Sequence, residues 1–410
     1  MTDIFAPPVP ALEFPVRTCP YQPPPAYDEH RARGPVTRVT MPSGDTGWLV
    51  TGYAEIRALF NDNRLSADRG SPDWPNFWPA PRKPRPTNAA VREAQEFNLM
   101  DDPEHAVLRR SVLPNLTVRR TRALRPAIRR GVDAVLDRML EAGPPVDLIP
   151  AFAAPVPAVM MAELFGIDPA DREFFEERVR RAATDRRLSG AALEELDAYL
   201  DHLIAVRADT AAAPRPGDLL SALAHRLTGG AGGLDRRQLV NAARVTLVAG
   251  NESTLNMIAL GTLTLLAHPG EAAALREDPS RIPRAVEELL RYLSISDPIP
   301  RMAIEDIEIA GQVIRAGDGV LLSAAGANRD TAVFPDPNTL DLSRPARHHV
   351  AFGYGVHQCV GQNLARVVLE SAYSCLLTRV PGLRLAVAPE EVGPSFGVGQ
   401  PRITTLPVTW

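Results

Sequence analysis

The feature that most constrains this fold is residues 235–267, a stretch that contains no proline although the chain has 40. Asp235 can cap the start of a helix there, and His268-Pro269-Gly270 ends it. At a rise of about 1.5 Å per residue, such a helix would be roughly 50 Å long, enough to cross the whole molecule. The chain therefore has to pack around one long central helix.

The same stretch approaches the length of a membrane span over residues 247–267. Glu252, Asn251 and Asn256 lie near its middle, however, and charge within a membrane is costly. We therefore expect a helix that is buried in protein, and no membrane partner. The N-terminus lacks the basic segment followed by an apolar one that marks a signal peptide, so we expect a cytoplasmic protein.

The rest of the chain divides into three parts of one expected domain, residues 1–410. The first 90 residues hold 16 of the 40 prolines, which favours turns and short strands. Apolar residues then recur at helical spacing, and after Arg301 short apolar runs alternate with turn residues, as in strands. We expect a mainly α protein with a minor β region: parts about 1–100, 101–300 and 301–410, helices 104–113, 118–142, 168–182 and 190–211, and strands at 48–53 and at the C-terminus.

Charge and cysteine content exclude several classes of protein. The formal net charge is −4 against 45 basic residues, so the molecule as a whole gives no case for nucleic acid binding. The three cysteines, Cys19, Cys359 and Cys375, are too few and too scattered for a disulfide framework. They indicate a reducing compartment.

The segment AFGYGVHQCVGQNLA, residues 351–365, places a cysteine between glycine-rich turns just before a helix. Cys359 could be a buried structural cysteine. It could bind zinc with His357, although a structural zinc needs four ligands and no second pair is visible. It could also be the thiolate ligand of a haem. A dinucleotide loop is excluded, because Gly353 and Gly355 lack the third glycine of that motif.

The haem interpretation suits the chemistry of this segment. The thiol of a free cysteine has a pKa of about 8.5. Metal coordination and a helix N-terminus both favour its thiolate form. Gly353 and Gly361 let the backbone approach a flat cofactor. The run F-G-Y-G-V-H-Q-C-V-G also resembles the haem-binding loop of the cytochromes P450 at Phe352, Gly355, Cys359 and Gly361. The resemblance implies the cytochrome P450 fold, with haem b between the long helix and this loop, and Cys359 as the axial ligand of its iron.

The resemblance extends to a Glu-x-x-Arg motif upstream, in EELLRY, where Glu288 and Arg291 lie three residues apart on one helix face. In the family an arginine from the loop before the cysteine completes the pair, and Arg344 matches it. An ordinary surface ion pair would contribute little to stability. The position of the motif relative to Cys359 favours a buried, structural role for the three residues.

Haem has propionates that need cations, and the resemblance implies four residues at matching places. His105 and Arg109 lie four apart in one helix, Arg301 follows DPIP, and His357 stands two residues before the cysteine. Arginine can hold a carboxylate through two parallel hydrogen bonds. Any one of these residues alone could equally be a solvated charge, but the set favours a propionate site.

The long helix contains AGNEST, which resembles the oxygen-activating segment of the family. By that resemblance Ala249 and Gly250 lie over the haem, and Gly250 leaves a groove for dioxygen at a cost of about 0.5–1 kcal/mol relative to alanine. Glu252 matches the acid of the proton relay, and Ser253, followed by Thr254, stands where the family usually has threonine. Serine keeps the hydroxyl but lacks the methyl that restricts the rotamers of threonine. The alternative is polarity of a helix face with no chemical role.

The resemblance implies a haem-thiolate monooxygenase that uses dioxygen to hydroxylate or epoxidise its substrate. Electrons would come ultimately from NAD(P)H through a ferredoxin and its reductase, since the haem fold takes up the 410 residues. The ferredoxin would dock on the cysteine side of a monomeric enzyme, where we expect Arg110, Arg119, Arg120 and Arg366. The alternatives are oxidative coupling of aromatic rings or peroxide-using catalysis on the same fold, and a non-catalytic haem sensor.

The substrate is expected to be apolar, an aromatic or polycyclic natural product of secondary metabolism. By the resemblance, the pocket walls come from the segment before His105, the long helix, the loop after Glu-x-x-Arg and a C-terminal turn. The tryptophans of the first segment could equally pack a proline-rich loop against the body of the protein. The candidate residues are Trp74, Phe77, Trp78, Leu247, Val248, Ile299, Phe396 and Val398.

Overall fold

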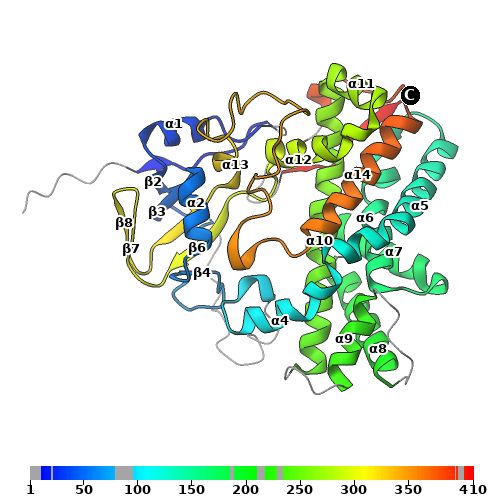
Figure 1. Cartoon of the computed structure of the whole chain (residues 1–410), viewed down its shortest axis with the longest axis horizontal. Helices are drawn as coiled ribbons and strands as arrows, with labels where there is room; N and C mark the ends of the chain where they lie inside the picture. Colours follow the sequence, from blue (N-terminus) through cyan, green and yellow to red (C-terminus); the bar gives the residue numbers. More distant parts are fainter. Residues whose placement is uncertain are drawn as a thin grey trace, which may run out of the picture.

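The computed structural model of the chain describes residues 11–19, 22–78, 96–184, 189–209, 218–228, 234–392, 394–395 and 401–410. A sheet-containing part lies beside a larger helical part (Figure 1). The loop before the last helix packs against the apolar cores of both parts. The architecture is mainly α with a minor β region, as predicted.

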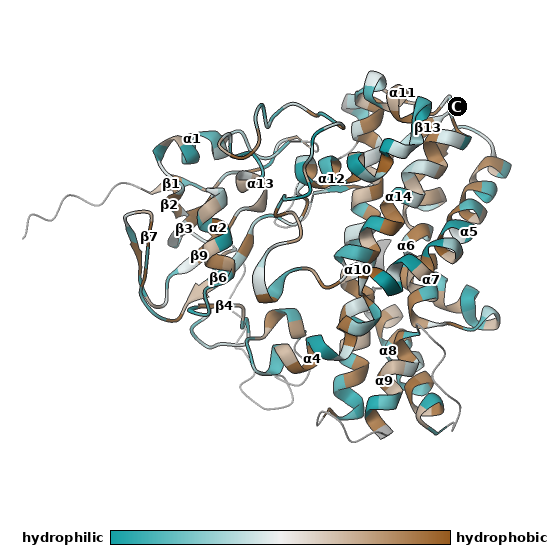
Figure 2. Cartoon of the chain, in the orientation of Figure 1, coloured by the Kyte–Doolittle hydropathy of each residue, from teal (hydrophilic) through white to brown (hydrophobic). Residues whose placement is uncertain are grey.

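The helical part is built around α10 (Arg236–Ala267), the predicted long helix, which runs through the molecule (Figure 1). A capping box starts it: Asp235 accepts from the Gln238 N–H at 2.8 Å, and the Gln238 side chain accepts from the Asp235 N–H at 2.9 Å. Apolar residues recur along α10 (Figure 2), and most of them are buried. Its neighbours include α4 (Glu104–Val112), α6 (Pro155–Phe165), α8 (Ser189–Asp209) and α14 (Gln362–Arg379).

The other helices surround this centre or support the sheet. α5 (Val118–Ala142) packs along α14 and has the predicted bounds. The helix predicted from residue 168 begins later, as α7 (Arg172–Thr184), because Asp168 caps a separate 3₁₀ turn over Pro169–Asp171. The remaining helices are α1 (Ala26–Arg33), α2 (Tyr53–Phe60), α9 (Leu219–Thr228), α11 (Pro269–Glu277), α12 (Ile282–Leu293) and α13 (Ala324–Ala327).

The main sheet has six strands in the order β1-β2-β3-β9-β6-β4. β3 (Thr46–Val50) pairs in parallel with β9 (Gly319–Leu322), and β6 (Ile299–Ala303) pairs antiparallel with the other edge of β9. Arg301 lies opposite Val320 in this register, so the sheet fixes its position. The outer strands are β1 (Leu12–Glu13), β2 (Val36–Thr40) and β4 (Leu65–Ser66).

Three small sheets complete the fold of the described residues. The predicted C-terminal strand is β13 (Pro407–Thr409), which pairs with β5 (Val146–Asp147) and β10 (Arg384–Leu385). The other pairs are β11 (Pro394–Ser395) with β12 (Arg402–Ile403), and β7 (Ile307–Ile309) with β8 (Gln312–Ile314). The C-terminal segment is thus held by strands from distant parts of the chain.

Aromatic residues before the helical part belong to a core beside the main sheet. Trp74 and Phe77 are buried, with ring centroids 5.7 Å apart, in a cluster that includes Leu49 of β3. Trp78 packs edge-on against Phe14. The structure places these residues in the core beside the sheet, and none of them lines the cavity described below. They pack the proline-rich segment onto the sheet, which was the alternative.

No single helix in the described ranges is both long enough and apolar enough to cross a membrane. α10 and α11 pass this test only as a pair, and they meet at a bend of 103°. Most apolar residues of α10 are buried against other helices, which accounts for its composition.

Candidate active site

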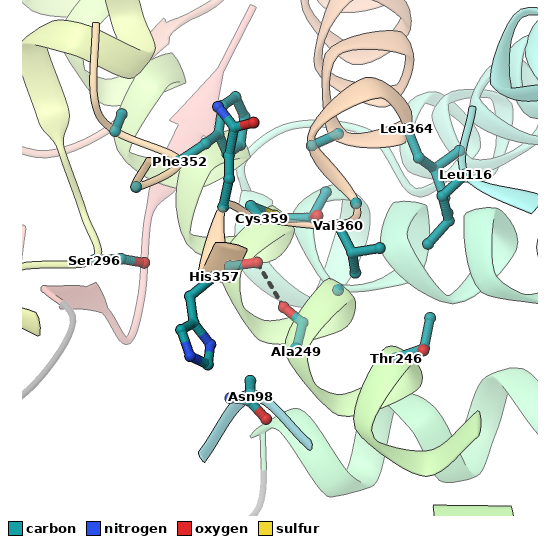
Figure 3. Close-up of a pocket in the computed structure, with 18 of the residues that line it drawn as sticks. Asn98, Leu116, Thr246, Ala249, Ser296, Phe352, His357, Cys359, Val360 and Leu364 are labelled. Carbon is teal, nitrogen blue, oxygen red and sulfur yellow. Dashed lines mark hydrogen bonds between the residues drawn. The ribbon is translucent and has the colours of Figure 1, made fainter. Parts of the chain in front are cut away.

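A cavity of about 290 Å³ lies between α10 and the loop that carries Cys359 (Figure 3). Its lining combines segments that are far apart in the sequence: α4, α6, α10, β6 and residues 351–361. Figure 3 shows Cys359 and Phe352 on the loop, with Ala249 and Thr246 on α10. The long helix and the cysteine loop therefore line one shared space, as the sequence predicted.

Two glycines shape the loop before Cys359. Gly353 and Gly355 have φ of +68° and +70°, in the left-handed region where a side chain is strained. A Cβ on Gly355 would also lie 2.5 Å from the carbonyl oxygen of Phe60. The turn closes with a hydrogen bond from the Cys359 N–H to the Phe352 carbonyl, at 2.8 Å. The loop thus fixes the cysteine just before α14 begins.

Gly361 provides a test of whether the cavity suits a flat cofactor. Its φ is an ordinary −86°, and no protein atom lies within 4 Å of a Cβ built on it. The protein itself therefore does not require glycine here. Gly361 and Cys359 both line the cavity, so glycine at position 361 keeps open space next to the cysteine for a bound planar group.

The Cys359 side chain is exposed toward the cavity and otherwise surrounded by protein. Burial raises the pKa of its thiol, and the backbone N–H of Gly361 and the guanidinium groups of Arg109 and Arg366 oppose that rise. The net direction is upward, so the free thiol is protonated at neutral pH. A bound metal ion ionises a coordinating thiol outright, and the nearby cations then stabilise the thiolate.

The predicted propionate ligands come together. Arg109, Arg301 and His357 line the cavity. The ring of His105 on α4 packs against that of His357 in a tilted arrangement, with ring centroids 4.1 Å apart. Arg109 donates to the Gln358 carbonyl at 2.6 Å, which joins α4 to the cysteine loop.

Electrostatics and hydrogen bonding both indicate that this group holds an anion. Burial, followed by the charges of Arg301, His105 and Arg109, lowers the pKa of His357 to about 3. Among the described residues, the buried His105 Nε2 and His357 Nδ1 atoms have no hydrogen-bond partner. Buried polar atoms without partners are uncommon in native proteins. The two carboxylates of a haem would supply both the partners and the negative charge.

α10 presents Ala249, Gly250, Ser253 and Thr254 to the cavity. Ser253 Oγ donates to the Ala249 carbonyl at 2.7 Å. A Cβ on Gly250 would overlap the Met161 methyl of α6, the end of a flexible side chain that also lines this cavity. Glycine at position 250 thus leaves the space that the Met161 methyl occupies, and the groove for dioxygen stays a prediction.

Glu252 does not line this cavity. Its carboxylate forms an ion pair with Arg402 of β12, and the two side chains are 36% and 38% exposed. With Leu247, Val248 and Asn251, Glu252 lines a second pocket of about 40 Å³ that also involves α7 and α8. A role of Glu252 as proton donor to the cavity therefore requires its carboxylate to leave Arg402.

Leu247 and Val248 face the second pocket and do not line the main cavity. The prediction that they form a wall of the main cavity is therefore wrong. A helix turns by about 100° per residue, so residues seven and eight positions before Ser253 share its face. These are Val245 and Thr246, and both line the cavity. The spacing from Ser253 could have identified them.

Ile299 of β6 lines the cavity as predicted, whereas Phe396 and Val398 lie outside the described residues. The contribution of α6 was not predicted. Its sequence, PVPAVMMAELF, is apolar on nearly every face, which is the signal of a helix buried on all sides. Cavity residues absent from the predicted set include Met160, Met161, Leu164, Asn98 and Ser296.

Glu288, Arg291 and Arg344 meet as predicted. Arg291 bonds both oxygens of Glu288, at 2.7 and 2.8 Å, and Arg344 Nε bonds one of them at 3.1 Å. Arg291 also donates to the carbonyls of Asn328 and Pro337. These bonds tie α12 to the chain that leads into the cysteine loop.

Arg366 departs from its predicted place on an exposed docking face. Its side chain is 14% exposed, and Nε donates to Glu287 at 2.7 Å. Arg110 and Arg119 are exposed, and Arg120 is half-buried. Glu287 therefore pairs with a largely buried arginine, as its neighbour Glu288 does. The sequence did not indicate this role of Glu287.

Comparisons with known proteins agree on one family. The family model "Cytochrome P450" matches residues 181–381. Pentalenic acid synthase of Streptomyces avermitilis is 45% identical to the chain, over 100% of this chain and 99% of its own. Mycinamicin VIII C21 methyl hydroxylase of Micromonospora griseorubida is 41% identical, over 94% and 97% of the two chains. The crystal structure of cytochrome P450 MoxA from Nonomuraea recticatena superposes with a TM-score of 0.89 and 41% identity, over 97% and 98% of the two chains.

Proposed function

The chain belongs to the cytochrome P450 family, and we propose that it is a monooxygenase that hydroxylates or epoxidises an apolar natural product of secondary metabolism. Membership implies an enzyme whose haem is held by a cysteine thiolate. The observation that carries the proposal is the shared cavity lined by Cys359 on one side and by Ala249 and Ser253 of α10 on the other. A relative named as a methyl hydroxylase supports hydroxylation as the reaction.

The cavity residues fit a haem. Cys359 would bind its iron, while Arg109, Arg301, His105 and His357 would hold its two carboxylates through charge-assisted hydrogen bonds. When bound, the haem supplies the activation of dioxygen, which no side chain can perform. The protein supplies orientation, protons and the exclusion of bulk water.

Ser253 is the residue that we propose to move protons within the cavity. Its hydroxyl donates to the Ala249 carbonyl at 2.7 Å, and its lone pairs remain free to accept. Serine lacks the methyl that would restrict χ1, so rotation can redirect the hydroxyl into the cavity. Thr254 lines the same wall and is 4% exposed, so it offers a second hydroxyl close by.

Glu252 is proposed as the link between Ser253 and solvent. Its side chain is 36% exposed beside Arg402, so it is in contact with solvent. Adjacent residues on a helix point about 100° apart. Glu252 must therefore rotate away from Arg402, or act through a bridging water, to pass a proton to Ser253.

The electron donor that we propose is an acidic ferredoxin, reduced in turn from NAD(P)H by its reductase. Arg110 and Arg119 offer exposed positive charge in a segment where Leu113 and Val118 are 40% and 46% exposed. Val356, three residues before the cysteine, is 45% exposed. Apolar contact surface with charge around it is typical of protein interfaces, and complementary charge speeds association.

The walls of the cavity favour an apolar substrate. Val245, Met257 and Ile299 line it together with the two methionines of α6. Methionine side chains adapt to irregular shapes, so the walls can accommodate a bulky polycyclic or macrocyclic skeleton. Thr246 and Asn98 supply polar groups that could orient a hydroxyl or carbonyl of that skeleton.

Two measurements test this function. The reduced, CO-treated protein should show a Soret band with the red shift that a thiolate ligand produces, and a band without it would exclude the assignment. Turnover with a ferredoxin, its reductase, labelled dioxygen and a panel of polycyclic terpenoids, macrolides and aromatic polyketides should then give a product with one labelled oxygen. An unlabelled, coupled product would favour oxidative coupling instead.

A further inference from the structure

Glu287, one residue before the Glu-x-x-Arg motif, holds an arginine of the last helix. Arg366 of α14 donates through Nε to Glu287 Oε1 at 2.7 Å and through Nη2 to Oε2 at 3.1 Å. The two side chains are only 14% and 11% exposed. A bidentate pair of this kind fixes both the position and the plane of the guanidinium.

His349 holds Glu287 from another side. Its Nδ1 accepts the N–H of Ala351 at 3.2 Å, so Nε2 carries the hydrogen and donates to Glu287 Oε2 at 3.2 Å. Burial alone would raise the pKa of Glu287, but the hydrogen bonds from His349 and Arg366 lower it to about 2. Glu287 is therefore an anion at neutral pH and a firm anchor for Arg366.

Arg366 reaches the cysteine loop from this anchored position. Its Cζ lies 4.8 Å from the centre of the Phe352 ring, within the range of a cation–π contact. The Phe352 carbonyl accepts the Cys359 N–H at 2.8 Å. Nη1 of Arg366 also donates to the carbonyl and the side-chain oxygen of Gln362, at 3.2 and 3.1 Å. One guanidinium thus contacts residues on both sides of the cysteine.

We propose that Arg366 is a positioning residue for the Cys359 thiolate: it holds the ring of Phe352 against the loop and keeps a positive charge close to the sulfur. The inference rests on the proposed function, because the thiolate requires bound iron. Hydrogen bonds and charges around a thiolate ligand tune the reduction potential of its metal. A cation here favours the state with one more electron, so Arg366 should raise the potential at which the site accepts an electron from its redox partner.

Because Arg366 and Glu287 carry opposite charges, removing either charge should shift the reduction potential in opposite directions. Arg366→Gln removes the cation and leaves the Glu287 anion, so the potential should fall. Glu287→Gln removes the anion and leaves the cation, so the potential should rise. A role in folding alone would destabilise both variants and would not shift their potentials in opposite directions.

The experiment measures the midpoint potential and the CO-bound absorbance spectrum of the purified, haem-loaded wild type and of both variants. Arg366→Lys keeps the charge but cannot hold both oxygens of Glu287, so its potential should stay close to that of the wild type while the thiolate spectrum is lost faster on warming. Arg379→Gln is the matched control, because this arginine of the same helix pairs with Asp137 at the surface, at 2.6 Å. Arg379→Gln should change neither the midpoint potential nor the CO-bound spectrum.

Opposite shifts in Arg366→Gln and Glu287→Gln, with no shift in Arg379→Gln, would support the inference. Shifts of the same sign, or none, in variants that retain the thiolate spectrum would overturn it. If Arg366→Gln fails to retain haem, the midpoint potentials of Glu287→Gln and Arg366→Lys are compared instead. The inference expects the potential of Glu287→Gln to be higher, so equal potentials would count against it. A wild type without the thiolate band would instead refute the proposed function, so the two failures are distinguishable.

Discussion

Glu288 accepts hydrogen bonds from Arg291 at 2.7 and 2.8 Å, and neither side chain is exposed to solvent. Arg344 adds a bond to the same carboxylate, and Arg291 also reaches two backbone carbonyls of the chain that leads to the cysteine loop. The pair therefore joins α12 to the segment that positions Cys359. Removing one partner leaves the other as a buried charge without compensation.

We expect Glu288→Gln to lower the free energy of unfolding by about 3–5 kcal/mol, the usual effect of breaking a buried pair. Urea unfolding followed by circular dichroism measures it. Asp306→Asn is the control, because its pair with Arg315 is 51% and 67% exposed and should contribute little to stability. Equal losses in the two variants would contradict a special role for Glu288.

Cys359→Ser should abolish the red-shifted CO band and turnover, because a serine hydroxyl does not replace the thiolate as an iron ligand. Cys375→Ser is the matched control, because Cys375 lies in α14, the helix that follows Cys359. Its thiol is buried and donates to Asp133 at 3.0 Å, a bond that a hydroxyl can also make. That variant should keep the spectrum, and a wild-type spectrum in Cys359→Ser would end the haem-thiolate assignment.

Ser253→Ala should reduce product formation by about a hundredfold, the lower end of what a positioned proton-transfer group contributes. Oxygen consumption should continue, with peroxide released in place of product. Ser253→Thr retains the hydroxyl and should keep most of the activity. The ratio of product to oxygen consumed is the measurement, and an unchanged ratio in Ser253→Ala would remove Ser253 from the proton path.

Glu287 should make stability depend on pH at the acid end. Although burial alone would raise it, the pKa of Glu287 is lowered from 4.5 to about 2 by His349 and Arg366. As the pH falls, the unfolded chain takes up this proton first, so stability present above about 4.5 is lost toward about 2. The loss amounts to about 3 kcal/mol over that window. Urea midpoints from neutral pH to about pH 3 should fall less steeply for Glu287→Gln than for the wild type.

Val245→Ala should widen the main cavity and improve the binding of bulkier substrates, because Val245 lines that cavity. Val248 lies three residues further along α10 and faces the second pocket. Val248→Ala should therefore leave substrate binding unchanged. Dissociation constants from substrate-induced spectral changes separate the two. A larger effect from Val248→Ala would show that the face of α10 has been assigned wrongly.

The parts of this molecule that follow from local chemistry were predictable. The capped helix from Asp235, the glycine turns before Cys359 and the Glu288–Arg291 pair all depend on residues close together in the sequence. Their spacing alone specifies which side chains share a face or a turn. The cysteine loop could then be placed opposite the long helix by resemblance to one family.

The parts that depend on packing between distant elements were not predictable. Nothing in the sequence around Gly250 indicates that the Met161 methyl fills the space of a side chain there. Trp74 looked like a pocket residue because apolar aromatic surface suits both a ligand wall and a core, and only the sheet decides between them. Arg366 looked exposed because its buried partner, Glu287, lies 79 positions away in the chain.

The ion pair between Arg402 and Glu252 connects the C-terminal part of this enzyme to the middle of its central helix. Glu252 of α10 takes its counter-ion from β12, which pairs with β11, and the next strand, β13, lies between β5 and β10. Exchanging this C-terminal segment between relatives, for instance to attach a fused reductase, would therefore also exchange the counter-ion of the acid that we propose as the link to solvent. A chimera that keeps the cysteine loop and α10 but carries another β12 would thus change the electrostatic surroundings of Glu252.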